Sequence, residues 1–202
     1  IGLYGNGGAP YNHAAAFAEA GFLTEFVFAS DILRGALAEF DVLVMPGGGC
    51  RAMMGQLDPL GAAGCRAIAD FVRAGGMYLG CCAGAFDASI VGEAFLRICP
   101  QQRDLQMIDA RVWNDGDDFL GLQSPGVGVL RARVAAPDHP VLRGMPETFE
   151  ISHYNGPLYR LDPGHVPGAS EATGLLAVAG TTDGFTPAER FLGADTPEAD
   201  LL

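Results

Sequence analysis

The sequence predicts an α/β fold, with a doubly wound and mostly parallel sheet sandwiched by helices. Three observations lead to this class. Short apolar segments alternate with helix-like segments up to residue 91, a pattern typical of parallel sheets with helical crossovers. Residues 41–45 form a nearly continuous apolar run, as expected for a strand that is buried on both faces. Glycine-rich turns follow the first, third and fourth expected strands, at the sheet edge where the sites of such folds form.

The elements of this sheet and its helices follow from apolar periodicity and from helix-end signals. Asn12 is the predicted N-cap of the first helix, and Ser30 or Asp31 is that of the second. Gly75 and Gly76 lie where the third helix is expected to end. The expected strands are 1–4, 25–29, 41–45 and 77–79, and the expected helices are 13–20, 32–39, 60–74 and 84–91.

The pattern changes after residue 95, where a small antiparallel excursion is expected. Apolar and polar positions alternate over the first of its strands, as in a strand with one buried face. The expected strands are 127–134, 148–153 and 175–178. No internal repeat or linker divides the chain, so we expect a single domain over residues 1–202. An alternative that stays open is that the extreme N- and C-terminal segments of this domain lie outside the given sequence.

Charge and composition limit the expected partners. The net charge is −12 with only 12 lysines and arginines, which argues against nucleic acids and anionic membrane surfaces. No apolar run is long enough to span a bilayer. The five cysteines are odd in number and lack zinc-type spacing, so a reducing compartment such as the cytoplasm is expected rather than a disulfide framework. We expect a small-molecule substrate and neither a cofactor nor a metal, and we leave a homo-oligomer open.

The segment Gly80-Cys81-Cys82-Ala83-Gly84 carries the main chemical signal of the sequence. It follows an expected strand and begins an expected helix, so Cys82 lies at the tip of a sharp strand-to-helix turn. The free N–H groups and the dipole of a helix N-terminus favour an anion such as a thiolate. Cys82 is therefore predicted to be a nucleophile. The alternative is a buried cysteine that only packs.

The reaction expected at Cys82 is attack of its thiolate on an acyl carbon. The oxyanion that develops in such a reaction requires preorganised hydrogen-bond donors. We predict that these donors are the N–H groups of Ala83, directly after the nucleophile, and of Gly48, in the turn after the third strand. Gly47 and Gly48 let the backbone approach closely, although an ordinary strand-to-helix turn would also explain them.

Four segments together resemble the class I glutamine amidotransferase-like superfamily, and within it the branch typified by the N-terminal domain of some biotin-protein ligases. These segments are Tyr4–Gly8, Val44–Gly48, Gly75–Ala85 and His153–Pro157. The similarity covers residues 1–90 closely and 137–160 loosely. It implies that the single domain has a flavodoxin-like α/β fold with a cysteine nucleophile at the elbow. In amidotransferases proper, the reaction is hydrolysis of glutamine through a thioester.

The resemblance leaves two explanations for the base that accepts the proton of Cys82. Amidotransferases use a histidine followed two positions later by an acidic residue, whereas this chain has Thr196 and Glu198 at the nearest similar positions. Either the histidine lies beyond the end of the sequence, or this dyad is absent. In the second case His153, at the end of an expected strand, is the predicted base, and Asn155 in the same segment is predicted to contact the substrate. The imidazole of His13 could also reach the site from the first loop.

Cys81, directly before the predicted nucleophile, has three interpretations. It packs as a buried residue, or it traps an oxidised Cys82 as a strained disulfide, or both thiolates join a histidine in a soft-metal site. Neighbouring side chains at a strand end point apart, which disfavours the metal site. We include Cys81 among the residues that line the substrate site.

The sequence therefore favours a cysteine-dependent hydrolase or amidotransferase-like enzyme that acts on a small amide or a related carbonyl compound. A catalytically silent member of the same fold, which binds a small metabolite or a protein, is one alternative. A cysteine-dependent hydratase or lyase of the same superfamily is the other.

Overall fold

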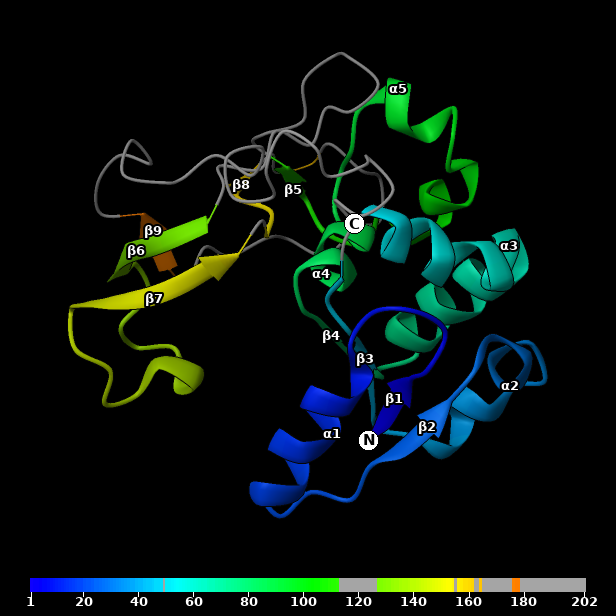
Figure 1. Ribbon diagram of the computed structural model, residues 1–202, viewed down its shortest axis with the longest axis horizontal. Coiled ribbons are helices and arrows are strands. Elements are labelled where there is room, and N and C mark those ends of the chain that lie inside the picture. The colour runs from blue at the N-terminus through cyan, green and yellow to red at the C-terminus, as the bar shows by residue number, and fades with distance from the viewer. Residues whose placement is uncertain (49, 113–126, 155, 162–163, 165–175, 179–202) are drawn as a thin grey trace, which may run out of the picture.

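The centre of the fold is a four-stranded parallel sheet. The strands are β1 (Gly2–Tyr4), β2 (Glu25–Val27), β3 (Val42–Met45) and β4 (Met77–Gly80). They follow the order β2-β1-β3-β4, and every neighbouring pair is parallel. The structure is a computed structural model, and it describes residues 1–48, 50–112, 127–154, 156–161, 164 and 176–178 (Figure 1). The parallel α/β sheet predicted from the sequence is confirmed.

The middle strand β3 is buried on both faces, as its continuous apolar run predicts. Leu43, Val44 and Met45 each have 0% of their surface exposed. Leu43 and Met45 pack on one face with Tyr4, while Val44 faces the opposite side because successive side chains alternate along a strand. Burial on both faces requires helices on both sides of the sheet.

Those helices lie where the apolar pattern requires them. The helices of the first half are α1 (Pro10–Glu19), α2 (Ala29–Leu33), η1 (Ala36–Glu39), α3 (Cys50–Arg73) and α4 (Ala83–Asp87). In Figure 1, α2 and α3 lie on one side of the sheet and α1 on the other. The main core fills the space between the sheet and α2 and α3. Its large side chains include Tyr4, Ile32, Leu43, Met45, Leu57, Leu60 and Ile68.

The predicted N-caps of the first two helices are wrong. α1 begins at Pro10, because proline has the backbone angle of a first helical residue and no N–H to satisfy, so Asn12 lies inside the helix. α2 begins directly after Phe28, and Asp31 is its third residue. The Asp31 carboxylate still satisfies a free donor, since it accepts a hydrogen bond from the N–H of Phe28 at 2.8 Å.

The lengths of the next two helices also differ from the prediction. α3 begins at Cys50 and bends at Gly61, whose φ of 54° and ψ of −171° are not helical. Gly61 and the preceding Pro59 explain the bend, so the predicted helix over 60–74 is its second half. α4 ends at Asp87, because Ile90 takes part in strand-like pairing with Arg111.

The second half of the described chain forms short antiparallel sheets, as predicted. β5 (Ala110–Val112) pairs with β8 (Tyr159–Leu161), and β6 (Val127–Val134) lies between β7 (Thr148–Tyr154) and β9 (Leu176–Val178). The remaining helical segments are α5 (Glu93–Leu96), η2 (Pro100–Leu105) and η3 (Pro140–Leu142). Figure 1 shows β6, β7 and β9 to one side of the parallel sheet.

Within the described residues, no helix combines the length and the apolar character that crossing a membrane requires.

Candidate functional site

The turn between β4 and α4 holds Cys82 in an unusual backbone conformation. Its φ is 52° and its ψ is −110°, and in the described part of the chain no other residue besides glycine has a positive φ. Cys82 is the residue directly before the first helical residue, Ala83, so it occupies the tip of the predicted elbow. A cysteine in this conformation is strained by roughly 1–3 kcal/mol, and such strain concentrates at functional sites.

Two glycines make this elbow possible, because each lies against backbone that a side chain would hit. A Cβ added at Gly80 would lie 2.5 Å from the carbonyl oxygen of Gly84. A Cβ added at Gly84 would collide with the carbonyl of Met45, the last residue of β3. The Tyr78 hydroxyl donates a hydrogen bond to the Gly84 carbonyl at 2.5 Å, which ties β4 to the start of α4.

The turn after β3 packs directly against the elbow. A Cβ added at Gly47 would lie 2.9 Å from the Cβ of Cys82, so only glycine fits there. The Cys82 thiol donates a hydrogen bond to the Gly48 carbonyl, with 3.8 Å between sulfur and oxygen. The loop after β1 also contacts the turn after β3, since the N–H of Ala9 donates a hydrogen bond to the Gly47 carbonyl at 2.8 Å. The three glycine-rich turns therefore converge, as expected at the carboxyl ends of parallel strands.

The predicted oxyanion donors lie in this cluster. Among the described residues, no acceptor is found for the N–H of Gly48 or for that of Ala83. The Gly47–Gly48 peptide is held in one orientation by the bond from Ala9. Two such donors beside a thiol are what an oxyanion site requires, and their role stays a prediction.

Cys81 is exposed, so its interpretation as a buried packing residue is wrong. It follows the last residue of β4 and faces solvent, whereas Cys82 is half-buried. Partial desolvation of the Cys81 thiol raises its pKa, and the neighbouring Cys82 raises it further. The Cys81 thiol therefore ionises less readily than the thiol of an isolated cysteine. This suits a residue that lines the site better than it suits the nucleophile.

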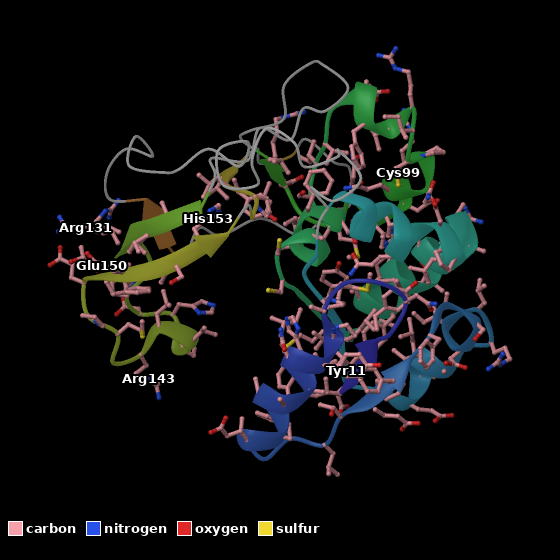
Figure 2. The ribbon with its side chains drawn as sticks, in the orientation of Figure 1. Tyr11, Cys99, Arg131, Arg143, Glu150 and His153 are labelled. Carbon is pink, nitrogen blue, oxygen red and sulfur yellow. The ribbon has the colours of Figure 1, made fainter. Side chains whose placement is uncertain are left out.

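The structure places His153 in the sheet of β6 and β7 rather than in the parallel sheet that carries the elbow. His153 lies on β7 opposite Gly128, and its Nε2 is buried near Gly156, where an added Cβ would lie 3.4 Å away. Figure 2 shows His153 on the sheet of β6 and β7, which lies to one side of the β4–α4 turn. Asn155 lies outside the described residues. The pairing of His153 with Cys82 stays a prediction.

His13, in α1, contacts the first loop, which itself packs against the turn after β3. Its Nδ1 is 3.2 Å from the carbonyl oxygen of Ala9. The N–H of Ala9 in turn binds Gly47, and Gly47 packs on Cys82. Three successive contacts therefore connect this imidazole to the nucleophile.

Comparison with known proteins finds a similarity for this part of the chain. Residues 36–97 match the family described as the N-terminal domain of biotin-protein ligase. The matched segment contains β3, the turn with Gly47 and Gly48, and the elbow, so the predicted resemblance to biotin-protein ligase N-terminal domains is confirmed there.

Other comparisons are weaker. Among curated proteins, none matches the sequence significantly. A solved structure from Thermoplasma acidophilum, provisionally assigned as part of a GMP synthase, is similar with a TM-score of 0.47 and 20% identity. That similarity covers 81% of this chain and 69% of the other.

The segment shared with biotin-protein ligase N-terminal domains also contains an acid that the sequence analysis missed. Asp87, the last residue of α4, has 0% of its surface exposed, and among the described residues neither of its carboxyl oxygens has a hydrogen-bond partner. Burial raises the pKa of Asp87 well above its usual range, because an enclosed carboxylate loses its hydration. The sequence does contain a signal for this residue, because Asp87 is an acid inside the apolar segment that follows the elbow.

Tyr159 on β8 is a second residue that the sequence analysis missed. It lies directly opposite Val112, which packs in a cluster with Ala83 and Phe86 of α4. Burial raises the pKa of Tyr159 above its usual range. No signal in the sequence places Tyr159 near the elbow, because β8 is far from β4 along the chain.

In the part of the chain that the structure describes, no group of three or more histidine, cysteine, aspartate and glutamate side chains is arranged to hold a metal ion.

Proposed function

We propose that the protein is a cysteine-dependent hydrolase or amidotransferase-like enzyme whose nucleophile is Cys82. The observation that supports this most directly is the positive φ of Cys82 at the strand-to-helix turn. A packing cysteine gains nothing from that conformation, whereas a nucleophile gains exposure of its side chain at the tip of the turn. The close packing of Gly47, Gly80 and Gly84 maintains the strained turn.

The reaction begins with removal of the Cys82 proton by a base. The thiolate then attacks the carbonyl carbon of a small amide, and the electron pair of the C=O bond moves to oxygen. The N–H groups of Gly48 and Ala83 stabilise this oxyanion. Collapse breaks the C–N bond, and the nitrogen leaves with the proton that the base had removed. Water hydrolyses the resulting thioester and regenerates Cys82.

An imidazole is the proposed base, and two are candidates. His153 is the residue that the sequence indicates. The contacts of the described residues favour His13, which is connected to Cys82 through Ala9 and Gly47. A carbonyl oxygen only accepts hydrogen bonds, so in the contact with Ala9 the hydrogen belongs to Nδ1 of His13. In the neutral ring, Nε2 can then accept a proton.

A binding module without catalysis is the second candidate function. It is favoured by the hydrogen bond that the Cys82 thiol donates to the Gly48 carbonyl, because this contact describes a resting thiol rather than a thiolate paired with a base. In such a protein the same groups around the elbow would hold a small metabolite.

Alkylation and amide hydrolysis distinguish the two functions. Under the enzyme proposal, limited iodoacetamide at about pH 6–7 labels Cys82 in preference to Cys81, since an unactivated thiol reacts slowly there. The protein then also releases ammonia from at least one of a panel of small primary amides, and Cys82→Ala abolishes this release. Preferential labelling of Cys81, or ammonia release that survives Cys82→Ala, would refute the assignment. Slow labelling with tight binding of an amide would support the binding module.

A further inference from the structure

A buried glutamine of α3 is bonded to the turn that follows β3. Gln56 has 0% of its surface exposed, and its Nε2 donates a hydrogen bond to the Pro46 carbonyl at 2.9 Å. Pro46 is the residue directly after β3. The backbone carbonyl of Gln56 accepts a hydrogen bond from the Tyr4 hydroxyl of β1 at 2.6 Å. Because its backbone and its side chain are both bonded, the Gln56 amide is held in one place against the end of the sheet.

Stability alone does not explain why this buried residue is polar. Among the described residues, Oε1 of Gln56 has no hydrogen-bond partner. An enclosed polar atom without a partner costs free energy, and a methionine would fill a similar volume without that cost. What glutamine provides and methionine lacks is the donor to the Pro46 carbonyl.

The loop after β1 packs against both the amide and the turn. Gly8 in this loop has a φ of 73°, and a Cβ added to it would lie 2.8 Å from Nε2 of Gln56 and 2.7 Å from the Gly47 carbonyl oxygen. Conformation and space therefore both require glycine at this position. The next residue, Ala9, donates its N–H to the same Gly47 carbonyl.

Two successive peptide groups of the turn are fixed in this way. Gln56 holds the carbonyl of the Pro46–Gly47 peptide, and Ala9 holds the carbonyl of the Gly47–Gly48 peptide. A trans peptide is planar, and its C=O and N–H point in opposite directions. The N–H of Gly48 therefore points away from the loop after β1, and the turn cannot rotate without breaking a hydrogen bond.

We propose that Gln56 is a positioning residue of the oxyanion site, which holds the Pro46 carbonyl so that the N–H of Gly48 stays available to the oxyanion formed at Cys82. This inference rests on the proposed function and adds a residue that does not touch the substrate. Oxyanion donors are effective because they are fixed before the reaction, and a displacement of about 1 Å weakens them strongly. Gln56 therefore affects reactions that form an oxyanion and leaves the reactivity of the Cys82 thiolate unchanged.

Two reagents separate the oxyanion from the thiolate on the whole chain. With p-nitrophenyl acetate, the Cys82 thiolate adds to the acetyl carbon and the C=O electron pair moves to oxygen; collapse then expels p-nitrophenolate and leaves an acetyl thioester. With iodoacetamide, the thiolate displaces iodide at the carbon beside the carbonyl, and no oxyanion forms. Mass spectrometry measures both rates at Cys82, each divided by the rate of free glutathione. The ratio of acetylation to alkylation is then independent of the thiolate fraction.

Gln56→Met keeps the length of the side chain and removes the donor. We expect the ratio of acetylation to alkylation to fall about ten- to hundredfold, with alkylation unchanged. Gln102→Met is the matched control and should keep the wild-type ratio. Gln102 is equally buried and also has an Oε1 without a partner among the described residues, but its Nε2 donates to the Phe86 carbonyl of α4, at 3.0 Å, and not to the turn.

A second pair of variants tests the same inference from the loop after β1, in case Gln56→Met does not fold. Gly8→Ala pushes a Cβ against the Gln56 amide and the Gly47 carbonyl from an exposed position, so the ratio should fall here too. Gly21→Ala is its control, because Gly21 has a similar φ of 83° and a Cβ there meets no described atom within 4 Å. It should leave the ratio unchanged.

The possible failures are distinguishable. If wild-type Cys82 is acetylated faster than glutathione but Gln56→Met or Gly8→Ala keeps the wild-type ratio, the inference is wrong and the proposed function stands. The inference is also wrong if alkylation falls as much as acetylation, or if Gln102→Met lowers the ratio equally, since Gln56 is then needed only for packing. If wild-type Cys82 reacts no faster than glutathione with either reagent, the proposed function fails and the inference fails with it.

Discussion

At the scale of single residues, two side chains of the elbow are held at an energetic cost. Cys82 has a backbone conformation that only glycine adopts easily, and Asp87 is buried with no partner among the described residues for its carboxyl oxygens. A chain selected for stability alone would avoid both. Strain and a buried acid within one short helix and its preceding turn are typical of a functional site.

Substitution of Cys82 by glycine separates strain from reactivity. We expect Cys82→Gly to stabilise the protein by about 1 kcal/mol, because relief of the positive φ exceeds the entropic cost of glycine in the unfolded chain. Urea unfolding measures the change, with Cys81→Gly as the control on the neighbouring residue. A loss of stability in Cys82→Gly would show that packing of the thiol outweighs the backbone strain.

Asp87 makes stability depend on pH in a defined direction. Its folded pKa is raised above the unfolded value, so its contribution is fully favourable below about pH 4 and is lost as pH rises toward the folded pKa. Asp87→Asn has no such proton to lose, so its stability relative to wild type should increase by up to about 1.4 kcal/mol per pH unit in that range.

Unfolding in urea at about pH 5 and about pH 8, on either side of neutrality, measures this effect. Asp138→Asn is the control, because Asp138 is exposed and its substitution leaves the pH dependence unchanged. A constant difference between Asp87→Asn and wild type at both pH values would mean that Asp87 is already ionised in the folded protein.

At the scale of elements, the elbow depends on how closely β4, α4 and the end of β3 approach one another. Gly80 and Gly84 have no room for a Cβ because backbone carbonyls occupy that space. Backbone cannot move aside as a flexible side chain can, since β3 and β4 are paired along their length. The glycines of the elbow are thus needed for space, independently of their φ angles.

This requirement predicts opposite effects for two glycine-to-alanine substitutions. Gly80→Ala places its Cβ 2.5 Å from the Gly84 carbonyl oxygen and should cost at least about 2 kcal/mol of stability. Gly55→Ala on α3 meets no described atom within 4 Å and should stabilise the helix by about 0.5–1 kcal/mol. Thermal and urea unfolding of both variants provide the measurement. Equal effects at the two positions would contradict the close approach at the elbow.

At the scale of the whole molecule, the parallel topology brings distant segments to one end of the sheet. The first loop, the turn after β3 and the elbow meet there through Ala9, Gly47 and Cys82. The paired strands β5 and β8, from the second half of the chain, lie beside α4 through Val112. By contrast, β7 pairs with β6 in a separate sheet that carries His153.

This arrangement makes His13 the expected base for the Cys82 thiol. We expect His13→Ala to raise the pH at which Cys82 is alkylated by iodoacetamide, because an imidazole that pairs with the thiol stabilises the thiolate. His153→Ala, its matched variant on β7, should leave that pH unchanged. The reverse result would restore the assignment of His153 made from the sequence.

The sequence by itself determined the parallel α/β sheet, the order of its first elements and the elbow. These features are local: an apolar run predicts a buried strand, and glycines around Cys82 predict a tight turn, without knowledge of distant contacts. The ends of helices were less predictable, because Pro10 displaced Asn12 as the start signal and Gly61 bent α3 without ending it.

Only the tertiary structure decided which side chains surround Cys82. The position of Tyr159 beside the residues that follow α4 depends on the pairing of β8 with β5 and on the attachment of β5 to Ile90. None of these is encoded in a local pattern, because strand partners far apart in sequence are chosen by packing of the whole chain. Burial has the same origin: Asp87 is an ordinary acid in the sequence, and its pKa is raised because the fold encloses it.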